Sequence, residues 1–82
     1  MDTLTLELDL VDTDNDGLAG LRARSAAGGV QLTVLNPCGP GGGNPVCQLS
    51  GGRYALLGWL LTNYTQDVDD IQYVMGDAKP AA

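Results

Sequence analysis

Leucines and polar residues alternate strictly along the N-terminal segment. The apolar positions of this pattern are Leu4, Leu6, Leu8 and Leu10. Because successive side chains of a strand point to opposite faces of a sheet, this period of two predicts a strand with one buried face. Residues 12–17 consist of Asp, Thr, Asn and Gly, which favour tight turns, so we expect the strand to end there.

A weaker alternation from residue 19 to residue 26 predicts a second strand. Its two faces would carry Leu21, Ala23 and Ser25 on one side, and Arg22 and Arg24 on the other. In one antiparallel register, Asp9 of the first strand lies opposite Arg22. The same register sets Glu7 opposite Arg24 and turns the apolar residues of both strands to one face, so we expect this pairing.

Two further strands are expected around a loop rich in glycine and proline. Residues 30–35 alternate apolar and polar side chains and predict a third strand. Residues 36–45 contain three prolines and four glycines, which exclude a helix or a central strand. Residues 46–49 predict a short fourth strand that returns beside the third as a hairpin.

The segment from Arg53 to Tyr64 predicts the core helix. Residues three and four apart along it share one apolar face, namely Leu56, Leu57, Leu60, Leu61 and Tyr64. Ser50 is expected to cap the first turn of this helix. The apolar faces of the first and third strands would then pack against Leu57, Leu60 and Leu61.

The tail from residue 65 to residue 76 is compatible with a short helix or a strand. Asp67 can cap a helix whose first turn contains Asp69 and Asp70, and Gly76 stands where such a helix would stop. The run 71–75 is also rich in strand-forming residues. We favour the helix, and we expect residues 79–82 to form a frayed end.

Strands followed by helices predict an α+β fold in a single domain spanning residues 1–82. The expected architecture is a three- to four-stranded antiparallel sheet that begins as an N-terminal meander. One face of this sheet would be packed by the core helix and by a short C-terminal helix or strand.

The core helix is apolar on nearly every side, and a single small sheet covers only one of them. Trp59 would therefore pack against the tail or against a second copy of the protein. A stripe of small residues lies behind the leucines. We predict a possible homodimer whose interface candidates are Trp59, Ala55, Gly58 and Thr62.

The net charge of −6 is distributed unevenly along the chain. Residues 1–17 and 67–82 contain all ten acidic side chains, whereas residues 18–66 contain three arginines and no acid. Such a chain repels nucleic acid and anionic membranes and attracts basic surfaces, although net charge also serves solubility. The candidate partner-binding acids are Glu7, Asp9, Asp12, Asp14, Asp16, Asp67, Asp69 and Asp70.

No catalytic constellation is recognisable in the sequence. Histidine is absent, so Ser25 and Ser50 have no imidazole to activate them, and we expect neither an enzyme nor a cofactor. The N-terminal residues do not resemble a signal peptide, which predicts a protein of the host-cell cytoplasm. There Cys38 and Cys47 would remain reduced, with an internal or an inter-protomer disulfide as the alternatives.

The acidic turn resembles the opening of a calcium loop of the EF-hand and dockerin type. Asp12, Asp14, Asp16 and Gly17 match its first six positions. The twelfth position, which holds a bidentate glutamate in an EF-hand, is occupied by Ala23. The resemblance implies a weak calcium site, and a solvated hairpin turn is the alternative.

In size, acidity and glycine-rich loop, the chain resembles the small acidic anti-CRISPR proteins of phages and mobile elements. Some members of that group mimic DNA on type I surveillance complexes. The resemblance implies a non-enzymatic inhibitor whose carboxylates occupy a basic, DNA-reading surface of its partner. The alternatives are a small dimeric interaction module, with or without stabilisation by calcium, and an antitoxin-like partner of a basic protein.

Overall fold

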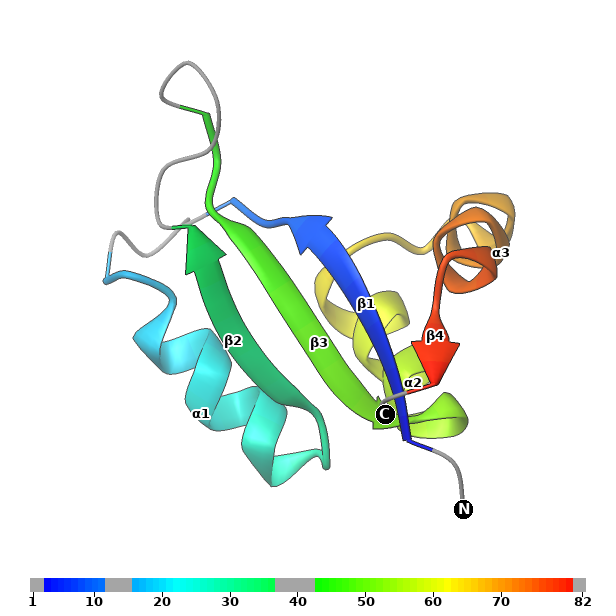
Figure 1. Cartoon of the computed structure of the whole chain (residues 1–82), viewed down its shortest axis with the longest axis horizontal. Coiled ribbons are helices and arrows are strands. Elements are labelled where there is room, and N and C mark those ends of the chain that lie inside the picture. Colours follow the sequence, from blue (N-terminus) through cyan, green and yellow to red (C-terminus); the bar gives the residue numbers. More distant parts are fainter. Residues whose placement is uncertain (1–2, 12–15, 37–42, 81–82) are drawn as a thin grey trace.

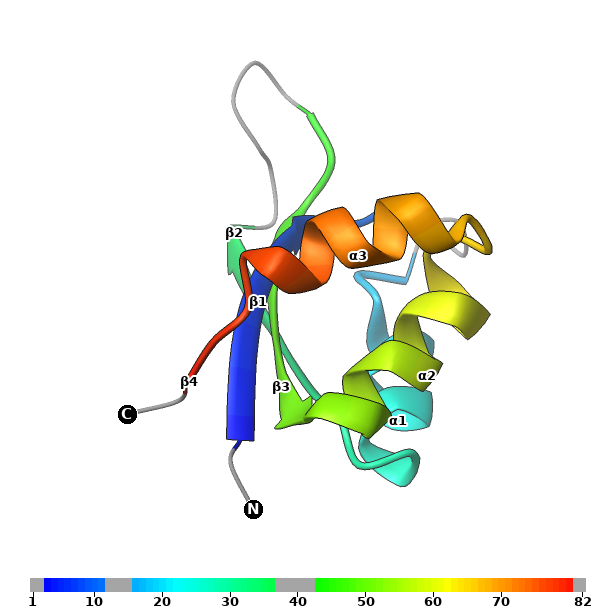
Figure 2. The same ribbon diagram turned by 90° about the vertical axis from the view of Figure 1, so that its right-hand side faces the viewer.

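The computed structural model describes residues 3–11, 16–36 and 43–80. A four-stranded antiparallel sheet has the order β2-β3-β1-β4, and three helices pack against it. The elements are β1 (Thr3–Asp9), α1 (Ala19–Ala27), β2 (Gln31–Asn36), β3 (Val46–Gly52), α2 (Arg53–Asn63), α3 (Val68–Gly76) and β4 (Lys79–Pro80). The helices lie on one side of the sheet (Figures 1 and 2). The predicted α+β class is therefore confirmed.

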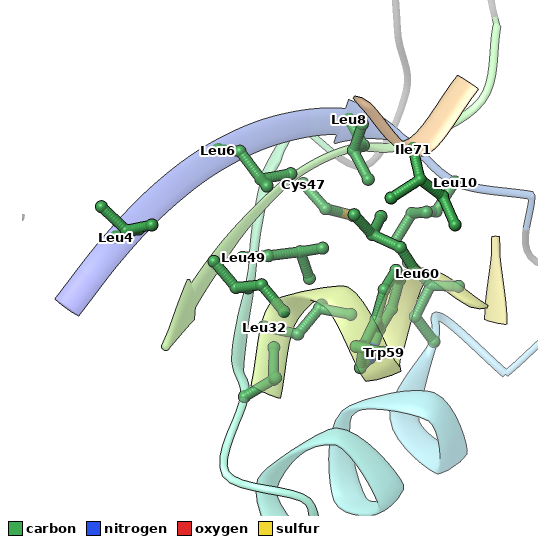
Figure 3. Close-up of a cluster of buried hydrophobic side chains, with 13 residues drawn as sticks. Leu4, Leu6, Leu8, Leu10, Leu32, Cys47, Leu49, Trp59, Leu60 and Ile71 are labelled. Carbon is green, nitrogen blue, oxygen red and sulfur yellow. The ribbon is translucent and has the colours of Figure 1, made fainter. Parts of the chain in front are cut away.

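Rows of apolar side chains run across the strands and form the core. Leu32 of β2, Leu49 of β3 and Leu6 of β1 occupy one row, because Leu49 is the register partner of both neighbours. Val34 and Leu8 flank Cys47 in the next row. Figure 3 shows the leucines of both rows and Cys47 gathered with Trp59, Leu60 and Ile71 from the helices. Full burial of one leucine contributes ~1.5–3 kcal/mol, so these rows dominate the stability of the domain.

Each helical crossover connects two parallel strands that have one other strand between them in the sheet. β1 and β2 both run antiparallel to β3, so they are parallel to each other, and α1 connects them. β3 and β4 are likewise parallel on either side of β1, and α2 and α3 connect them. Two interlocked split βαβ units result. This is the βαββαβ order of ferredoxin-like domains, with α3 as an additional helix.

The prediction of a second strand at residues 19–26 is wrong, because this segment forms α1. The expected pairings of Asp9 with Arg22 and of Glu7 with Arg24 are therefore wrong as well. Strand β1 instead pairs with β3, with Glu7 opposite Gln48 and Asp9 opposite Val46. Alanine, the strongest helix former, supplies four of the nine residues of α1. Leu18, Leu21 and Ser25 also recur at helical spacing on its inner side.

Helix α2 forms at the predicted core segment, but its buried face is rotated relative to the prediction. Leu56, Trp59 and Leu60 are buried, whereas Leu61 is exposed. Ser50 does not cap this helix, because it lies within β3 and pairs with Thr5. The N-cap position belongs to Gly52, which has no side chain to offer.

Helix α3 confirms the helical reading of the tail. The Asp67 side chain accepts a hydrogen bond from the Asp69 amide at 2.9 Å, as expected of a cap. The predicted frayed end is wrong for two residues, because Lys79 and Pro80 form β4 opposite Thr5 and Leu4. The predicted hairpin of β2 with β3 is confirmed.

A buried hydrogen bond joins the two crossover helices. The Trp59 indole Nε1 donates to the Ser25 hydroxyl at 2.6 Å, and this hydroxyl donates to the Leu21 carbonyl at 2.6 Å. Ser25 is only 2% exposed and Trp59 only 6%. The bond satisfies the single polar atom of the tryptophan, so the ring can fill the space between α1 and α2 at little polar cost.

Replacing Ser25→Ala is expected to lower the free energy of unfolding by about 1–3 kcal/mol, because the buried Nε1 donor loses its acceptor. Urea denaturation of the four proteins of a Ser25→Ala and Trp59→Phe double-mutant cycle checks this. In the Trp59→Phe background, which has no donor, the serine substitution should cost clearly less. Equal costs in both backgrounds would show that the hydrogen bond contributes nothing.

Gly51 of β3 is required by a close approach of two backbone segments. A Cβ atom built on Gly51 would lie 2.9 Å from the Gly29 carbonyl oxygen, at the turn that precedes β2. Gly29 itself has a positive φ of 84°. The turn and the strand therefore approach too closely for any side chain at position 51.

We expect Gly51→Ala to destabilise the protein by about 1–3 kcal/mol, because the backbone must shift to admit the methyl group. Gly58→Ala is the matched control. Position 58 is an exposed helix interior with open space around its Cβ, so alanine there should stabilise by about 0.5–1 kcal/mol. Thermal melts of both variants should shift in opposite directions. A shift of the same sign would contradict this account of Gly51.

Candidate acidic binding surface

The sheet face opposite the helices is polar. Its cross-strand rows follow from the register: Gln31–Ser50–Thr5–Lys79 in one row and Thr33–Gln48–Glu7 in the next. Glu7 and Asp9 lie on this outer face and are exposed, because the leucines of β1 occupy the alternate, buried positions. The strand pattern read from the sequence therefore determines where these two carboxylates stand.

Three carboxylates lie around one hollow beside β1. Glu7, Asp9 and Asp77 line it together with Tyr64 and Tyr73, and its volume is about 420 Å³. The Tyr73 side chain is 80% exposed, so its ring is available to a partner. We name Glu7, Asp9 and Asp77 the acidic edge. The binding residues predicted from the sequence include the first two but neither Asp77 nor either tyrosine.

Strand register explains why Asp77 joins this group. Because Lys79 of β4 lies opposite Thr5, the residue two places earlier falls near Glu7, two places further along β1. Asp77 is also the C-cap of α3, and its amide donates to the Val74 carbonyl at 3.1 Å. The pairing of β4 with β1 has no recognisable sequence pattern, so Asp77 was not among the predicted binding residues.

The other predicted acids do not join the acidic edge around this hollow. Asp67, Asp69 and Asp70 stand at the opposite end of α3, where Asp67 caps the helix. Asp16 precedes α1, and its Oδ2 accepts a hydrogen bond from the Gly20 amide at 3.1 Å. Asp12 and Asp14 lie outside the described residues. The acids therefore form separate groups at different places on the fold.

Basic residues lie near parts of these groups. Lys79 shares a second hollow with Glu7 and Asp77, and Arg24 shares a third with Asp9 and Asp16. Both basic side chains are exposed. Arg22 faces away from the acidic edge, since it lines a hollow between α1 and β2. Of the four basic residues in the chain, Lys79 and Arg24 therefore line hollows together with members of the acidic groups.

The calcium prediction concerns a segment that is only partly described. Asp16 and Gly17 are described, whereas the other two aspartates of the motif are not. Within the described ranges, no group of three or more histidine, cysteine, aspartate or glutamate side chains is placed to hold a metal ion. Asp16 there acts at the start of α1, and the flanking elements are a strand and a helix rather than two helices.

The dimer candidates on α2 separate into buried and exposed positions. Trp59 is buried in its own chain, where its indole donates a hydrogen bond to Ser25, and it lines a groove with the other three candidates, so its role at a dimer interface stays a prediction. Ala55 is half-buried, whereas Gly58 and Thr62 are exposed. These three residues line a groove with Arg24 and Tyr54. Their role in a homodimer stays a prediction.

Cys47 is a free, fully buried cysteine in the central strand β3, whereas Cys38 lies outside the described residues. Burial raises the pKa of the Cys47 thiol above its ordinary value of 9.0, and the nearby negative charge of Asp9 raises it further. Because the thiolate is the reactive form, this cysteine is held in its unreactive state.

Comparison with known proteins found no match to this chain among protein-family models, characterised proteins or solved structures. In the part of the chain that the structure describes, no helix has the length and apolar character needed to cross a membrane.

The raised pKa of Cys47 predicts a loss of stability at alkaline pH. Above pH 9 the unfolded chain releases the thiol proton while the folded chain keeps it, so the free energy of unfolding falls, by at most about 1.4 kcal/mol per pH unit. In a Cys38→Ser background, urea denaturation from pH 8 to pH 10.5 should show a steeper fall with Cys47 than with Cys47→Ala. Parallel curves would contradict the shift.

Proposed function

We propose that this protein is a non-enzymatic binding protein that docks its acidic edge on a basic surface of a partner. The observation that carries the proposal is the convergence of Glu7, Asp9 and Asp77 with the exposed Tyr73 around one hollow. Carboxylates attract lysine and arginine, and an exposed aromatic face adds a cation–π contact of ~0.5–1 kcal/mol or more.

The placement of Asp77 supports a role in binding rather than in folding. A negative charge at a helix C-terminus opposes the helix dipole, which costs about 0.3–1 kcal/mol. Asp77 occupies this position on α3, whose last turn has no basic residue, and its hollow also holds Glu7. Locally unfavourable choices of this kind concentrate at functional sites.

The narrower form of the proposal is an inhibitor of the anti-CRISPR type. Glu7 and Asp9 are alternate residues of one strand, so their side chains repeat every ~6.5–7 Å along it. A series of negative groups on a narrow edge suits a surface that normally tracks a nucleic-acid backbone. The expected partner is a type I surveillance complex, whose DNA-reading surface would be occupied in the host-cell cytoplasm.

Neutralising the acidic edge is expected to weaken binding to a basic partner. The variant combines Glu7→Gln, Asp9→Asn and Asp77→Asn. Its affinity for a fluorescein-labelled oligo-arginine peptide, measured by fluorescence anisotropy at low salt, should fall by about tenfold. The same variant should be as stable as the parent or slightly more stable, because the charge at the C-terminus of α3 has been removed.

A matched control carries Asp12→Asn, Asp14→Asn and Asp16→Asn. It changes the net charge by the same amount, and asparagine keeps the capping capacity of residue 16. This protein should bind the peptide within about twofold of the parent. An equal loss of affinity in both variants would show that net charge alone drives binding. A loss of affinity only in the control would show that the peptide binds at the acidic turn.

A second measurement tests the partner. Binding of target DNA by a purified type I surveillance complex is followed by gel shift in the presence of increasing protein. The parent and the turn variant should displace DNA, whereas the edge variant should not. If the parent does not compete with DNA but still binds the peptide, the surveillance complex is not the partner. The proposal that the acidic edge binds a basic surface would then still hold.

A further inference from the structure

A second surface lies at the opposite edge of the sheet, between α1 and β2. A hollow of about 860 Å³ is lined there by one face of α1, which consists of Ala19, Arg22, Ala23 and Ala26, and by residues 29–33, which lead into and begin β2. Thr3 of β1 and residues 50–52 at the end of β3 line the rest of it. Figure 1 shows α1 running alongside β2 at this edge. The alanine side chains are exposed and short, so a chain can approach the strand closely.

Strand β2 offers unpaired backbone groups to this hollow. It is the terminal strand in the order β2-β3-β1-β4, so among the described strands only one of its sides is paired. Residues 31–34 contain no charge and no proline, two features by which edge strands commonly avoid further pairing, and the irregularity in the register of β2 lies beyond them, between Val34 and Asn36. The other edge differs, because β4 has two residues and one of them is Pro80. An extended chain added beside residues 31–34 would pair with the backbone groups on the outer side of this part of β2.

Charge indicates which chain fits this edge. Among the described residues that line the hollow, Arg22 is the sole charged one, and the elements α1, β2 and β3 contain no acid. An occupant with a carboxylate would therefore complement the site. A second copy of the chain joined through β2 is less favourable. A two-fold interface would bring Arg22 of both copies into it, and neither copy has an acid in α1, β2 or β3 to pair with the arginine of the other.

We propose that this edge binds an extended acidic segment of a partner protein by strand addition. The segment pairs with β2 as a fifth strand, and an aspartate or glutamate of the segment binds Arg22. Small side chains of the segment lie over the alanines of α1. This surface is independent of the acidic edge, which lies on the far side of the sheet at β1 and α3.

The test uses blocked hexapeptides of alternating threonine and valine that carry one glutamate, placed at each position in turn, and the matching peptides with lysine. The best glutamate peptide should bind about tenfold more tightly than its lysine counterpart. Arg22→Glu should reverse this preference. The control Arg53→Glu, an equal change of charge at an exposed position outside the hollow, should keep it.

Two further variants separate strand addition from charge alone. Ala23→Tyr fills the hollow and should weaken binding of the glutamate peptide by about tenfold, whereas Ala27→Tyr, on the same helix but outside the hollow, should leave it unchanged. Amide chemical shifts in NMR spectra should move along β2.

Several results would overturn the proposal. These are the absence of saturable binding by every peptide, equal affinity for glutamate and lysine peptides, and shifts confined to β1 and α3. Self-association of the parent that Ala23→Tyr abolishes, without any peptide binding, would assign the edge to a second copy instead.

Discussion

Burial of one face of the sheet against short helices is the constraint on which the structure depends. Helix α1 has nine residues and buries only Ser25, so its own propensity cannot hold it, since isolated helices of this length are marginal in water. The hydrogen bond from Trp59 to Ser25 links it to α2, which in turn covers the leucine rows. The edge that α1 forms with β2 therefore depends on a contact on the other side of that helix.

Acidic residues are distributed unevenly along the sequence, and because of the strand order the two edges of the sheet differ in charge. Residues 18–66 supply α1, β2, β3 and α2 and contain no acid. The acids lie in residues 2–16, which include β1 and the segment that leads to α1, and in residues 67–77, which include α3 and Asp77. Because β2 and β4 are the outermost strands, the acid-free elements occupy one side of the sheet and the carboxylates of β1 and Asp77 lie toward the other. A protein with this arrangement can engage a basic surface and an acidic segment at separate places.

Local patterns sufficed for β1, for the hairpin of β2 with β3 and for the existence of both C-terminal helices, because the periodic residues, and for α3 also the capping residue Asp67, lie close together in sequence. They failed for α1, where alternation suits a strand but alanine content suits a helix. The contact from Trp59 to Ser25 spans 34 residues, and a local pattern cannot reveal it. The acidic edge was recognised only in part, because the place of Asp77 follows from the register of β4 with β1, a pairing of two residues that has no sequence signature.

Solubility explains a net negative charge but does not explain its position. Acids that serve solubility alone can stand anywhere on the surface, and those at helix N-termini, such as Asp67 and Asp69, also stabilise the fold. Asp77 stands at the opposite, unfavourable end of the same helix and shares a hollow with Glu7, where like charges repel. Lys79 of the same chain lines a neighbouring hollow with both acids and offsets part of this repulsion, and under the proposed function a cation of the partner would offset the rest.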